Sequence, residues 1–394
     1  MSKLEELIQQ YCPDGVEWKH LEEFCEIKTG KGITKKDSDE NGTYPIISGG
    51  VTPMGYYHIF NREGKTVTIS RVGANAGLVS FIDKRFYLND KCFSIIPSNG
   101  TNAKFLYYIL SAREADIKGM QSEGGVPTIN TQKVGSIEIP VPPLPVQEEI
   151  VRILDTFTEL QAELQAELQK RKQQYNYYLD NLLSFNDINR GGQAEVRWMK
   201  MNEVFEIRNG YTPSKAKKEF WEGGTIPWFR MEDIRQNGRI LSDSILHITP
   251  KGVKGKGLFK ANSFILATTA TIGEHALIIA DSLANQQFTN LSIRKSLENE
   301  LSVKYVYYYF FVIDEWCKAN TNVSNFASVD MSKFYNLLIP IPSIAEQQRI
   351  VSILDRFDQL TNDLTSGLPA EIEKRRQQYE YYRDKLLTFK RKGA

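Results

Sequence analysis

Short loops that combine glycine with lysine, arginine and amide side chains are the parts of this sequence best suited to chemistry. They occupy residues 28–36, 48–50 and 70–77 in the first half, and residues 208–218, 251–257, 268–273 and 284–288 in the second. Glycine lets a backbone approach a phosphate closely, and a lysine or arginine neutralises the phosphate charge. Arginine, asparagine and glutamine can also form paired hydrogen bonds with base edges. The loops therefore predict contacts with a nucleic acid.

The best candidates for base contacts are Arg71 with Asn75, and the run from Asn285 to Gln287. The complete set of candidate DNA-binding residues is Lys28, Lys31, Ser48, Arg71, Asn75, Arg208, Asn209, Tyr211, Lys254, Lys256, Thr269, Asn285, Gln286 and Gln287. An ordinary solvated turn is the alternative interpretation for each of them, because loops rich in Gly, Asn and Lys are common.

No motif of a common enzyme class accompanies these loops. The sequence has no GxxxxGK[ST] phosphate-binding loop, no glycine-rich dinucleotide pattern after a strand, and no Asn/Asp-Pro-Pro-Tyr stretch of an amino-methyltransferase. His20, His58, His247 and His275 are isolated, and none forms a pair at metal-ligand spacing. The four cysteines include no CxxC pair, so disulfides and a zinc site are not expected. We expect no catalysis, no metal and no cofactor on this chain.

Composition describes an ordinary globular protein. The 394 residues predict two or three domains, with 41% hydrophobic and 25% charged residues. The net charge of +1 counts mildly against a protein that grips DNA unaided through bulk electrostatics. The sequence has no run of 18 apolar residues, and its first ten residues lack the apolar core of a signal peptide. We expect a cytoplasmic protein that does not contact a membrane.

A long internal repeat must position the loops. The segment "IPVPPLPVQEEIVRILDTFTELQAEL" from Ile139 returns from Ile339 as "IPIPSIAEQQRIVSILDRFDQLTNDL". The repeat resumes after a four-residue slip, with "KRKQQYNYYLDNLLSF" ending at Phe185 and "KRRQQYEYYRDKLLTF" ending at Phe389. Two matching spacers that join two divergent blocks predict a ruler, meaning a spacer of set length that holds two different recognition blocks at a fixed separation.

Both copies of the repeat are predicted to be long helices. In the first copy, positions spaced alternately by four and three residues are mostly apolar or aromatic: Ile150, Leu154, Phe157, Gln161, Leu164, Leu168, Arg171, Tyr175, Tyr178, Leu182 and Phe185. The prolines at 140, 142, 143 and 145 are expected to precede this helix. At 1.5 Å per residue, some 40 residues make a rod of about 60 Å. The two helices are expected to pair with each other; the alternative is that each packs only against its own block. If the blocks are related by a pseudo-two-fold axis, the paired helices are antiparallel.

The second copy carries an equivalent seam with one irregularity. Its seam consists of Ile350, Leu354, Phe357, Thr361, Leu364, Leu368, Ile372, Arg375, Tyr379, Tyr382, Leu386 and Phe389. The four extra residues lie within "TSGLPAEIE", which also contains Gly367 and Pro369. A four-residue insertion alone would preserve the seam, whereas glycine and proline favour a kink or a break near 366–369.

The two blocks between the repeats share one frame. "VEWKHLEEFCEIKTGKGIT" from Val16 matches "VRWMKMNEVFEIRNGYTPS" from Val196, and short strand-like segments follow in each block. The predicted fold is mixed α/β, with one domain type repeated twice and two long helices that are expected to pair antiparallel as a coiled coil. The predicted segments are 1–138 for the first domain with a short N-terminal helix, 139–190 for the first helix, 191–338 for the second domain and 339–394 for the second helix.

This pattern resembles the specificity subunits of type I restriction–modification systems. The resemblance rests on the two hinges at Ile139 and Ile339, the tandem "KRxQQYxYYxxxLLxF" segments and the two "VxWxxxxE" openings, and it covers essentially the whole chain. It implies a non-catalytic subunit with two target recognition domains separated by two long antiparallel helices. Each domain would read one half of a split, asymmetric site in double-stranded DNA, and the helices would hold the gap between the halves. The divergent loops then predict two different half-sites.

The resemblance also implies partners. Two copies of an adenine methyltransferase subunit would bring S-adenosylmethionine, and a restriction and translocase subunit would bring the ATP- and Mg-dependent activities. The candidate methyltransferase-docking residues are Arg171, Tyr175, Tyr178, Arg375, Tyr379 and Tyr382. A simple solvated helix face is the alternative for these six. For the whole chain, the alternatives are a coiled-coil scaffold that joins protein partners without reading bases, and an enzyme with an unrecognised site.

Overall fold

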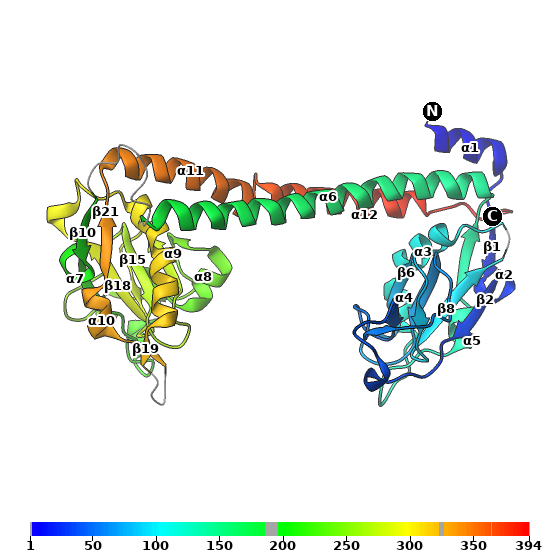
Figure 1. Cartoon of the computed structure of the whole chain (residues 1–394), viewed down its shortest axis with the longest axis horizontal. Helices are drawn as coiled ribbons and strands as arrows, with labels where there is room; N and C mark the ends of the chain where they lie inside the picture. The colour runs from blue at the N-terminus through cyan, green and yellow to red at the C-terminus, as the bar shows by residue number, and fades with distance from the viewer. Residues whose placement is uncertain (1, 99, 186–195, 323–326, 364, 394) are drawn as a thin grey trace. The chain divides into compact units, whose positions relative to one another are not determined.

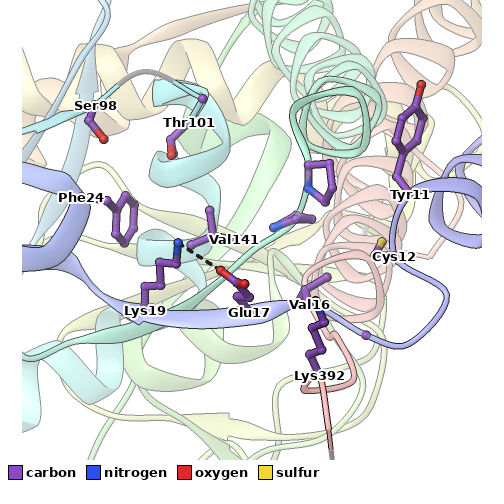
Figure 2. Close-up of a pocket in the computed structure, with 14 residues that line it drawn as sticks. Tyr11, Cys12, Val16, Glu17, Lys19, Phe24, Ser98, Thr101, Val141 and Lys392 are labelled. Atoms are coloured by element: carbon purple, nitrogen blue, oxygen red, sulfur yellow. Dashed lines mark ion pairs between the residues drawn. The ribbon is translucent and has the colours of Figure 1, made fainter.

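The computed structural model describes residues 2–98, 100–185, 196–322, 327–363 and 365–393 (Figure 1). These residues form two compact units. Unit 1 combines Met1–Ala166 with Ala370–Ala394, and unit 2 is Glu167–Pro369. Each unit therefore takes its main domain from one block and its helices from both copies of the repeat.

Unit 1 is built on an antiparallel sheet in the order β2-β8-β5-β6. Its strands are β2 (Cys25–Thr29), β8 (Cys92–Pro97), β5 (Thr66–Ser70) and β6 (Val79–Ile82). The central strand β5 reads "TVTIS" and is buried throughout, as expected for a strand rich in β-branched residues. Helix α3 (Ala103–Ala112) packs on β5 and β6 through a buried face that includes Phe105, Leu106 and Ile109.

Two smaller sheets complete unit 1. In the first, β3 (Tyr44–Ile47) lies between β4 (Tyr56–Tyr57) and β7 (Tyr87–Leu88), parallel to β7 and antiparallel to β4. In the second, β1 (Glu17–His20) pairs with β9 (Glu138–Val141). Helix α1 (Lys3–Tyr11) precedes β1. The helices α2 (Leu21–Phe24), α4 (Glu114–Gly119) and α5 (Thr131–Gly135) lie between strands along the chain.

Unit 2 repeats this plan with additions. Its main sheet has the order β11-β18-β15-β16-β13, where β11 is Phe205–Asn209, β18 is Phe288–Ile293, β15 is Ser263–Ala267 and β16 is His275–Ile278. The smaller sheets are β14 (His247–Ile248), β12 (Ile226–Phe229) and β17 (Leu283–Ala284), and the pair β10 (Arg197–Lys200) and β21 (Leu338–Ile341). Helix α9 (Val303–Ala319) takes the place of α3. The short helix α8 (Met231–Asn237) and β13 (Ile240–Leu241) are additions with no counterpart at this place in unit 1.

The first repeat forms one helix, α6 (Leu144–Leu183), of 40 residues. It begins one residue before Pro145, so the expectation that all four prolines precede the helix is wrong for this one. The reason is local: the first turn of a helix has no partner for its backbone N–H groups, so the missing N–H of proline costs nothing there.

The second repeat forms two helices, α11 (Ile344–Asn362) and α12 (Leu368–Leu386). This confirms the predicted break, although it begins at Asp363, before the predicted 366–369. Asp363 accepts hydrogen bonds from the backbone N–H of Thr365 (2.7 Å) and from the hydroxyl of Ser366 (2.5 Å). These bonds hold the pKa of the Asp363 carboxyl well below its usual range, the Ser366 hydroxyl contributing most. The seam position Leu364 lies outside the described residues.

Within each unit, a helix of one repeat packs against a helix of the other. In unit 1, Phe157 of α6 stacks on Tyr382 of α12 with ring centroids 5.5 Å apart. In unit 2, Phe357 of α11 stacks on Tyr178 of α6 at 5.1 Å. Phe157 and Phe357 are equivalent in the two repeats, as are Tyr178 and Tyr382. The same seam contact is thus made twice with the partners exchanged, whereas a continuous coiled coil remains a prediction.

In the parts of the chain that the structure describes, no helix is long and apolar enough to span a membrane.

Candidate nucleic-acid interface

The predicted loops of unit 1 meet at one edge of its sheets. Ser70, the last residue of β5, pairs with Cys92, the first residue of β8. The last residue of β2 pairs with the next residue of β8, and β3 and β7 are parallel and end side by side. Strand pairing therefore gathers four loops, which we call the first loop edge: residues 30–36, 48–52, 71–77 and 89–91.

Hydrogen bonds and close approaches connect these loops. The Asn75 amide donates to the carbonyl of Gly49 (3.0 Å), and the Asn89 amide donates to the carbonyl of Ile33 (2.8 Å). Gly30 lies so close to the backbone of Leu88 and its neighbour that a Cβ atom would be 2.2 Å from a carbonyl oxygen. Only glycine fits there, which explains its place at the start of the first loop.

Unit 2 gathers its loops in the same way. Ala267, the last residue of β15, pairs with Phe288, the first residue of β18, while β12 and β17 are parallel and end together. The Asn285 N–H donates to the carbonyl of Phe229 at 3.0 Å. A Cβ atom on Gly210 would lie 2.2 Å from a carbonyl oxygen, as on Gly30. This second loop edge comprises residues 210–217, 251–257, 268–273 and 285–287.

The candidate residues of unit 1 differ in how far they are free to bind a ligand. Lys28 forms an ion pair with Glu26 at 2.6 Å. Ser48 is buried, and the Asn75 amide is engaged within the edge. Lys31 is exposed, and its ammonium group has no ion pair or hydrogen bond to any described residue. Lys31 is therefore available to a phosphate.

Arg71 lies at the centre of the first loop edge. Its guanidinium stacks over the ring of Phe93 at 5.3 Å, and Nη1 donates to the carbonyl of Asp90 at 3.3 Å. Its Nε is buried and has no partner among the described residues. The stacked ring and one long hydrogen bond orient the guanidinium but leave most of its donors unused.

In unit 2, two candidates hold a loop. Arg208 donates to the carbonyls of Gly257 (2.7 Å) and Leu258 (3.2 Å). The Tyr211 hydroxyl donates to the carbonyl of Gly252 (3.2 Å) and accepts from the N–H of Lys254 (2.6 Å). These contacts fix the segment 251–258 beside β11. The segment carries two exposed lysines, Lys254 and Lys256, whose positive charges face solvent.

The run from Asn285 to Gln287 forms a tight turn. Asn285 Oδ1 accepts the N–H of Gln287 at 3.0 Å. Asn89 of unit 1 makes the same bond to the N–H of Lys91 at 3.0 Å. Asn285 therefore shapes the turn, as its equivalent does in unit 1. Gln286 is exposed at the tip, and its carbonyl accepts from the hydroxyl of Thr212.

The remaining candidates of unit 2 contact the sheet. Asn209 is exposed, and its side-chain oxygen accepts from the hydroxyl of Thr289 at 3.1 Å. Thr269 forms an isolated bridge with Ser328. Thr269 lies within the second loop edge and Asn209 directly precedes it, and each is already engaged by one of these contacts.

Some further cations at the edges are not among the individual candidates predicted from the sequence, although Lys35 and Lys36 belong to the predicted loop 28–36. The first loop edge contains three such lysines: Lys35, Lys36 and Lys91. None of them makes a side-chain ion pair with a described residue. Lys91 sits in the two-residue turn before β8, which is too short to stand out as a basic loop. Arg230, which follows β12, is held by an ion pair to Glu232 at 3.1 Å.

The buried thiols offer no reactive group. Burial raises the pKa of Cys25 to about 12, that of Cys92 to about 11 and that of Cys317 to about 12. At neutral pH these cysteines are protonated and poor nucleophiles. Among the described residues, no group of three or more His, Cys, Asp or Glu side chains is placed to hold a metal ion.

A buried ionic cluster supports unit 2 behind its sheet. His275 is fully buried, and its Nδ1 lies 2.6 Å from Asp314 Oδ2. Arg239 bonds the same carboxylate at 3.4 Å and Glu274 at 2.5 Å. Burial lowers the pKa of His275 despite the opposing attraction of Asp314. The cluster joins β16 to α9 and plays a structural part.

The predicted docking arginines make matching bonds on the repeat helices. Arg171 pairs with Glu167 at 2.7 Å, and Arg375 pairs with Glu371 at 2.7 Å. Tyr175 is buried at 8% exposure, so it belongs to the core of unit 2. Each arginine ion pair joins residues four positions apart on one helix and engages the Nε of the arginine.

Exposed tyrosine pairs mark the outer faces of the same helices. Tyr178 and Tyr382 are 40% and 37% exposed, and each packs edge-on against its preceding tyrosine. Those neighbours, Tyr177 and Tyr381, are more exposed, at 65% and 63%. Both lie in the repeated segments "KRKQQYNYY" and "KRRQQYEYY", but neither is among the six candidate docking residues predicted from the sequence. Tyr379 is half-buried, and burial raises its pKa to about 12.

Two mixed α/β units, each with a polar loop edge and joined by repeated helices, define a recognition protein built by internal duplication. Residues 13–171 and 194–374 match the model of the type I restriction modification DNA specificity domain. The chain belongs to this family, as the sequence predicted. Membership in a family of specificity subunits also agrees with the expectation of a non-catalytic chain.

Individual relatives support this assignment. The chain is 36% identical over 416 residues to the type I restriction enzyme EcoR124I/EcoR124II specificity subunit of Escherichia coli, covering 99% of this chain and 97% of that one. It is 53% identical over 204 residues to the EcoprrI specificity subunit of Escherichia coli, a match that spans 50% of this chain and 51% of the relative. The S subunit of a type I restriction–modification system from M. genitalium has a similar fold, with a TM-score of 0.57, 18% identity and coverage of 94% and 95%.

Proposed function

We propose that this chain reads an asymmetric, bipartite site in double-stranded DNA and directs methyltransferase and restriction subunits to it. One observation carries the proposal: the DNA specificity family is matched twice, and each match contains one loop edge. Two readers in one chain fit a site with two recognised halves.

Side-chain differences between the edges support unequal half-sites. The residue directly after β5 is Arg71, whereas the residue directly after β15 is Thr268. The turn before β8 ends in Lys91, and the equivalent turn before β18 ends in Gln287. Arginine favours guanine and glutamine favours adenine in the major groove, so the edges select different bases.

Exposed lysines whose ammonium groups pair with no described residue supply the phosphate contacts. Lys31 and Lys91 serve the first loop edge, and Lys254 and Lys256 serve the second. Each neutralised phosphate releases counterions and strengthens binding at low salt. Since the net charge of the whole chain is only +1, the partner subunits provide part of the grip.

The repeated helices are the docking surface for the partners. The pairs Tyr177–Tyr178 and Tyr381–Tyr382 recur at equivalent positions of α6 and α12, which suits two copies of one methyltransferase subunit. Exposed aromatic side chains are favoured anchors of protein interfaces. S-adenosylmethionine, ATP and Mg²⁺ then belong to the methyltransferase and restriction subunits.

Methylome sequencing of cells with and without this gene tests the proposal most directly. We expect one bipartite motif with two different halves to lose its adenine methylation when the gene is deleted, and to regain it on complementation. Deleting the methyltransferase gene alone is the control and should give the same loss. An unchanged methylome in the deletion strain would refute the proposal.

A further inference from the structure

Two valines stand out among the polar residues near the first loop edge. Val51 is 79% exposed and Val126 is 63% exposed. Single exposed apolar residues are common on protein surfaces. These two are unusual because they lie on either side of the same candidate DNA-reading loop.

Backbone contacts place both valines beside the loop 71–77. On one side, Asn75 donates to the carbonyl of Gly49, two residues before Val51. On the other side, Gly73 donates its N–H to the carbonyl of Pro127 at 2.9 Å, one residue after Val126. Arg71 thus lies at the start of a loop flanked by apolar side chains.

The loop that carries Val51 is closed at its base. The N–H of Met54 donates to the carbonyl of Ile46 at 2.9 Å, and the N–H of Ile46 donates to the carbonyl of Gly55 at 2.9 Å. Val51 therefore projects from the tip of a short, closed loop. A fixed tip presents a side chain to a ligand without a large ordering cost.

We propose that Val51 and Val126 contact the C5-methyl groups of thymines in the half-site read by unit 1. The inference rests on the proposed function and names a base chemistry for it. The thymine methyl is the apolar group that base pairs display in the major groove, and apolar side chains recognise it by contact. The surrounding free cations, Lys31 and Lys91, favour a polyanionic ligand at this surface over an apolar protein surface.

Replacing thymine by uracil removes the methyl group and leaves the hydrogen-bonding edge unchanged. The experiment uses the full chain in complex with its methyltransferase, and duplexes that carry the methylome-defined motif. Each thymine of both halves is replaced in turn by deoxyuridine, and the dissociation constant is measured. We expect at least one replacement, in one half only, to weaken binding about three- to fivefold, as for the loss of one buried methyl group.

Valine variants assign the effect to these residues. In Val51→Ala, Val126→Ala and the double variant, binding to the thymine duplex should weaken, and the penalty for uracil should shrink towards one. Ile279→Ala is the matched control, because Ile279 is 45% exposed and follows β16 at the end opposite the loop edge. Its uracil penalty should equal that of the unaltered chain.

Each other outcome is decisive. Equal binding of every uracil duplex, with the motif still recognised, overturns the inference and leaves the proposed function intact. A uracil penalty that persists in the double variant also overturns it, since another residue then reads the methyl. Valine variants that bind both duplexes normally but release the methyltransferase would assign the patch to a protein partner. Failure to bind any bipartite motif would instead refute the proposed function.

Discussion

Several polar side chains at the loop edges serve the protein itself, and the few that remain free decide what each unit offers to DNA. Asn75 connects two loops, Asn285 holds a turn, and Arg208 and Tyr211 hold a loop. Arg71 differs because a ring orients its guanidinium while its donors are mostly unused. A preoriented arginine with free donors is well suited to paired hydrogen bonds with guanine.

Arg71→Ala should relax recognition of one half-site only. Loss of one bidentate contact costs about 1–3 kcal/mol of discrimination, or roughly 5- to 150-fold. Binding to a panel of duplexes with single substitutions in each half measures this. Lys31→Ala is the control: it should weaken all duplexes alike and reduce the salt dependence by about one counterion. Equal losses at both halves for Arg71→Ala would indicate a phosphate contact or misfolding.

Unit 2 should lose stability as the pH falls below the ordinary histidine range. Burial lowers the pKa of His275 in the folded state, against the pull of Asp314 and Glu274 and together with the repulsion from Arg239. Below a pH of about 6.5 the unfolded chain binds a proton that the folded chain does not, so acid favours unfolding. The contribution of His275 to the free energy of unfolding is therefore fully present near pH 7.5 and declines towards pH 5.5.

Thermal unfolding followed by tryptophan fluorescence measures this effect. Four of the five tryptophans, Trp198, Trp221, Trp228 and Trp316, belong to unit 2. His275→Gln should lower Tm at pH 7.5 and reduce the further fall between pH 7.5 and 5.5. An unaltered pH slope in this variant would show that other groups cause the acid sensitivity.

At the scale of the elements, the interrupted second helix distinguishes the two repeats. The first repeat is a continuous helix, whereas in the second one helix ends at Asn362 and the next begins at Leu368. The break is specified locally by Asp363, which bonds the start of the next turn, and by Gly367, which packs against α11. The four-residue insertion thus forms a short connection between α11 and α12 that is held by its own hydrogen bonds.

Gly367→Ala should destabilise unit 2 by about 1–3 kcal/mol. A Cβ atom at this position would lie 2.5 Å from the carbonyl oxygen of Gln359 and 2.7 Å from that of Asp363, so the end of α11 would have to shift. The free energy of unfolding by urea measures the effect. Gly119→Ala is the matched control, because nothing lies within 4 Å of a Cβ atom there. Equal stability of both variants would contradict a close-packed break.

Four residues inserted after Leu164 should lengthen the spacer between the half-sites. They add one helical turn and about 6 Å to α6, which corresponds to about two base-pair steps. Methylome sequencing of cells that carry the variant reads the new spacer. Replacing Glu163 and Gln165 by alanine, without insertion, is the control and should leave the motif unchanged. An unaltered spacer in the insertion variant would contradict the hypothesis that the helices set the distance between the half-sites.

At the scale of the whole molecule, the duplication predicts two equivalent docking sites. Tyr177 and Tyr381 are the most exposed tyrosines of the two repeat helices that contain them, and each is packed edge-on against its neighbour. Equivalent surfaces in one chain bind equal partners, so the stoichiometry reports whether both sites are used.

Tyr381→Ser should reduce the complex from two methyltransferase copies to one, and the double variant with Tyr177→Ser should bind none stably. Native mass spectrometry of the co-purified complex measures the copies directly. Tyr56→Ser is the control, since Tyr56 is 47% exposed and lies outside the repeats. Two copies retained by the double variant would place docking elsewhere.

The sequence by itself determined the duplication, the two long helical segments, the break and the family. The helices and the break depend on local periodicity and on proline and glycine, which act within a few residues. The duplication and the family are visible when one segment of the sequence is compared with another. The loops that form the two edges were also visible, because glycine and basic residues cluster between strand-like segments. Pro145 was misplaced because its tolerance in a first turn depends on where the helix begins.

Only the tertiary structure decided which side chains at each edge are free. Arg208 is engaged by carbonyls about 50 residues away, and the Asn75 amide by a carbonyl 26 residues away. Strand pairing brings such segments together, and no local pattern reveals which donor meets which acceptor. For the same reason the sequence identified basic loops, whereas the structure separated the side chains that build the edges from those left for DNA.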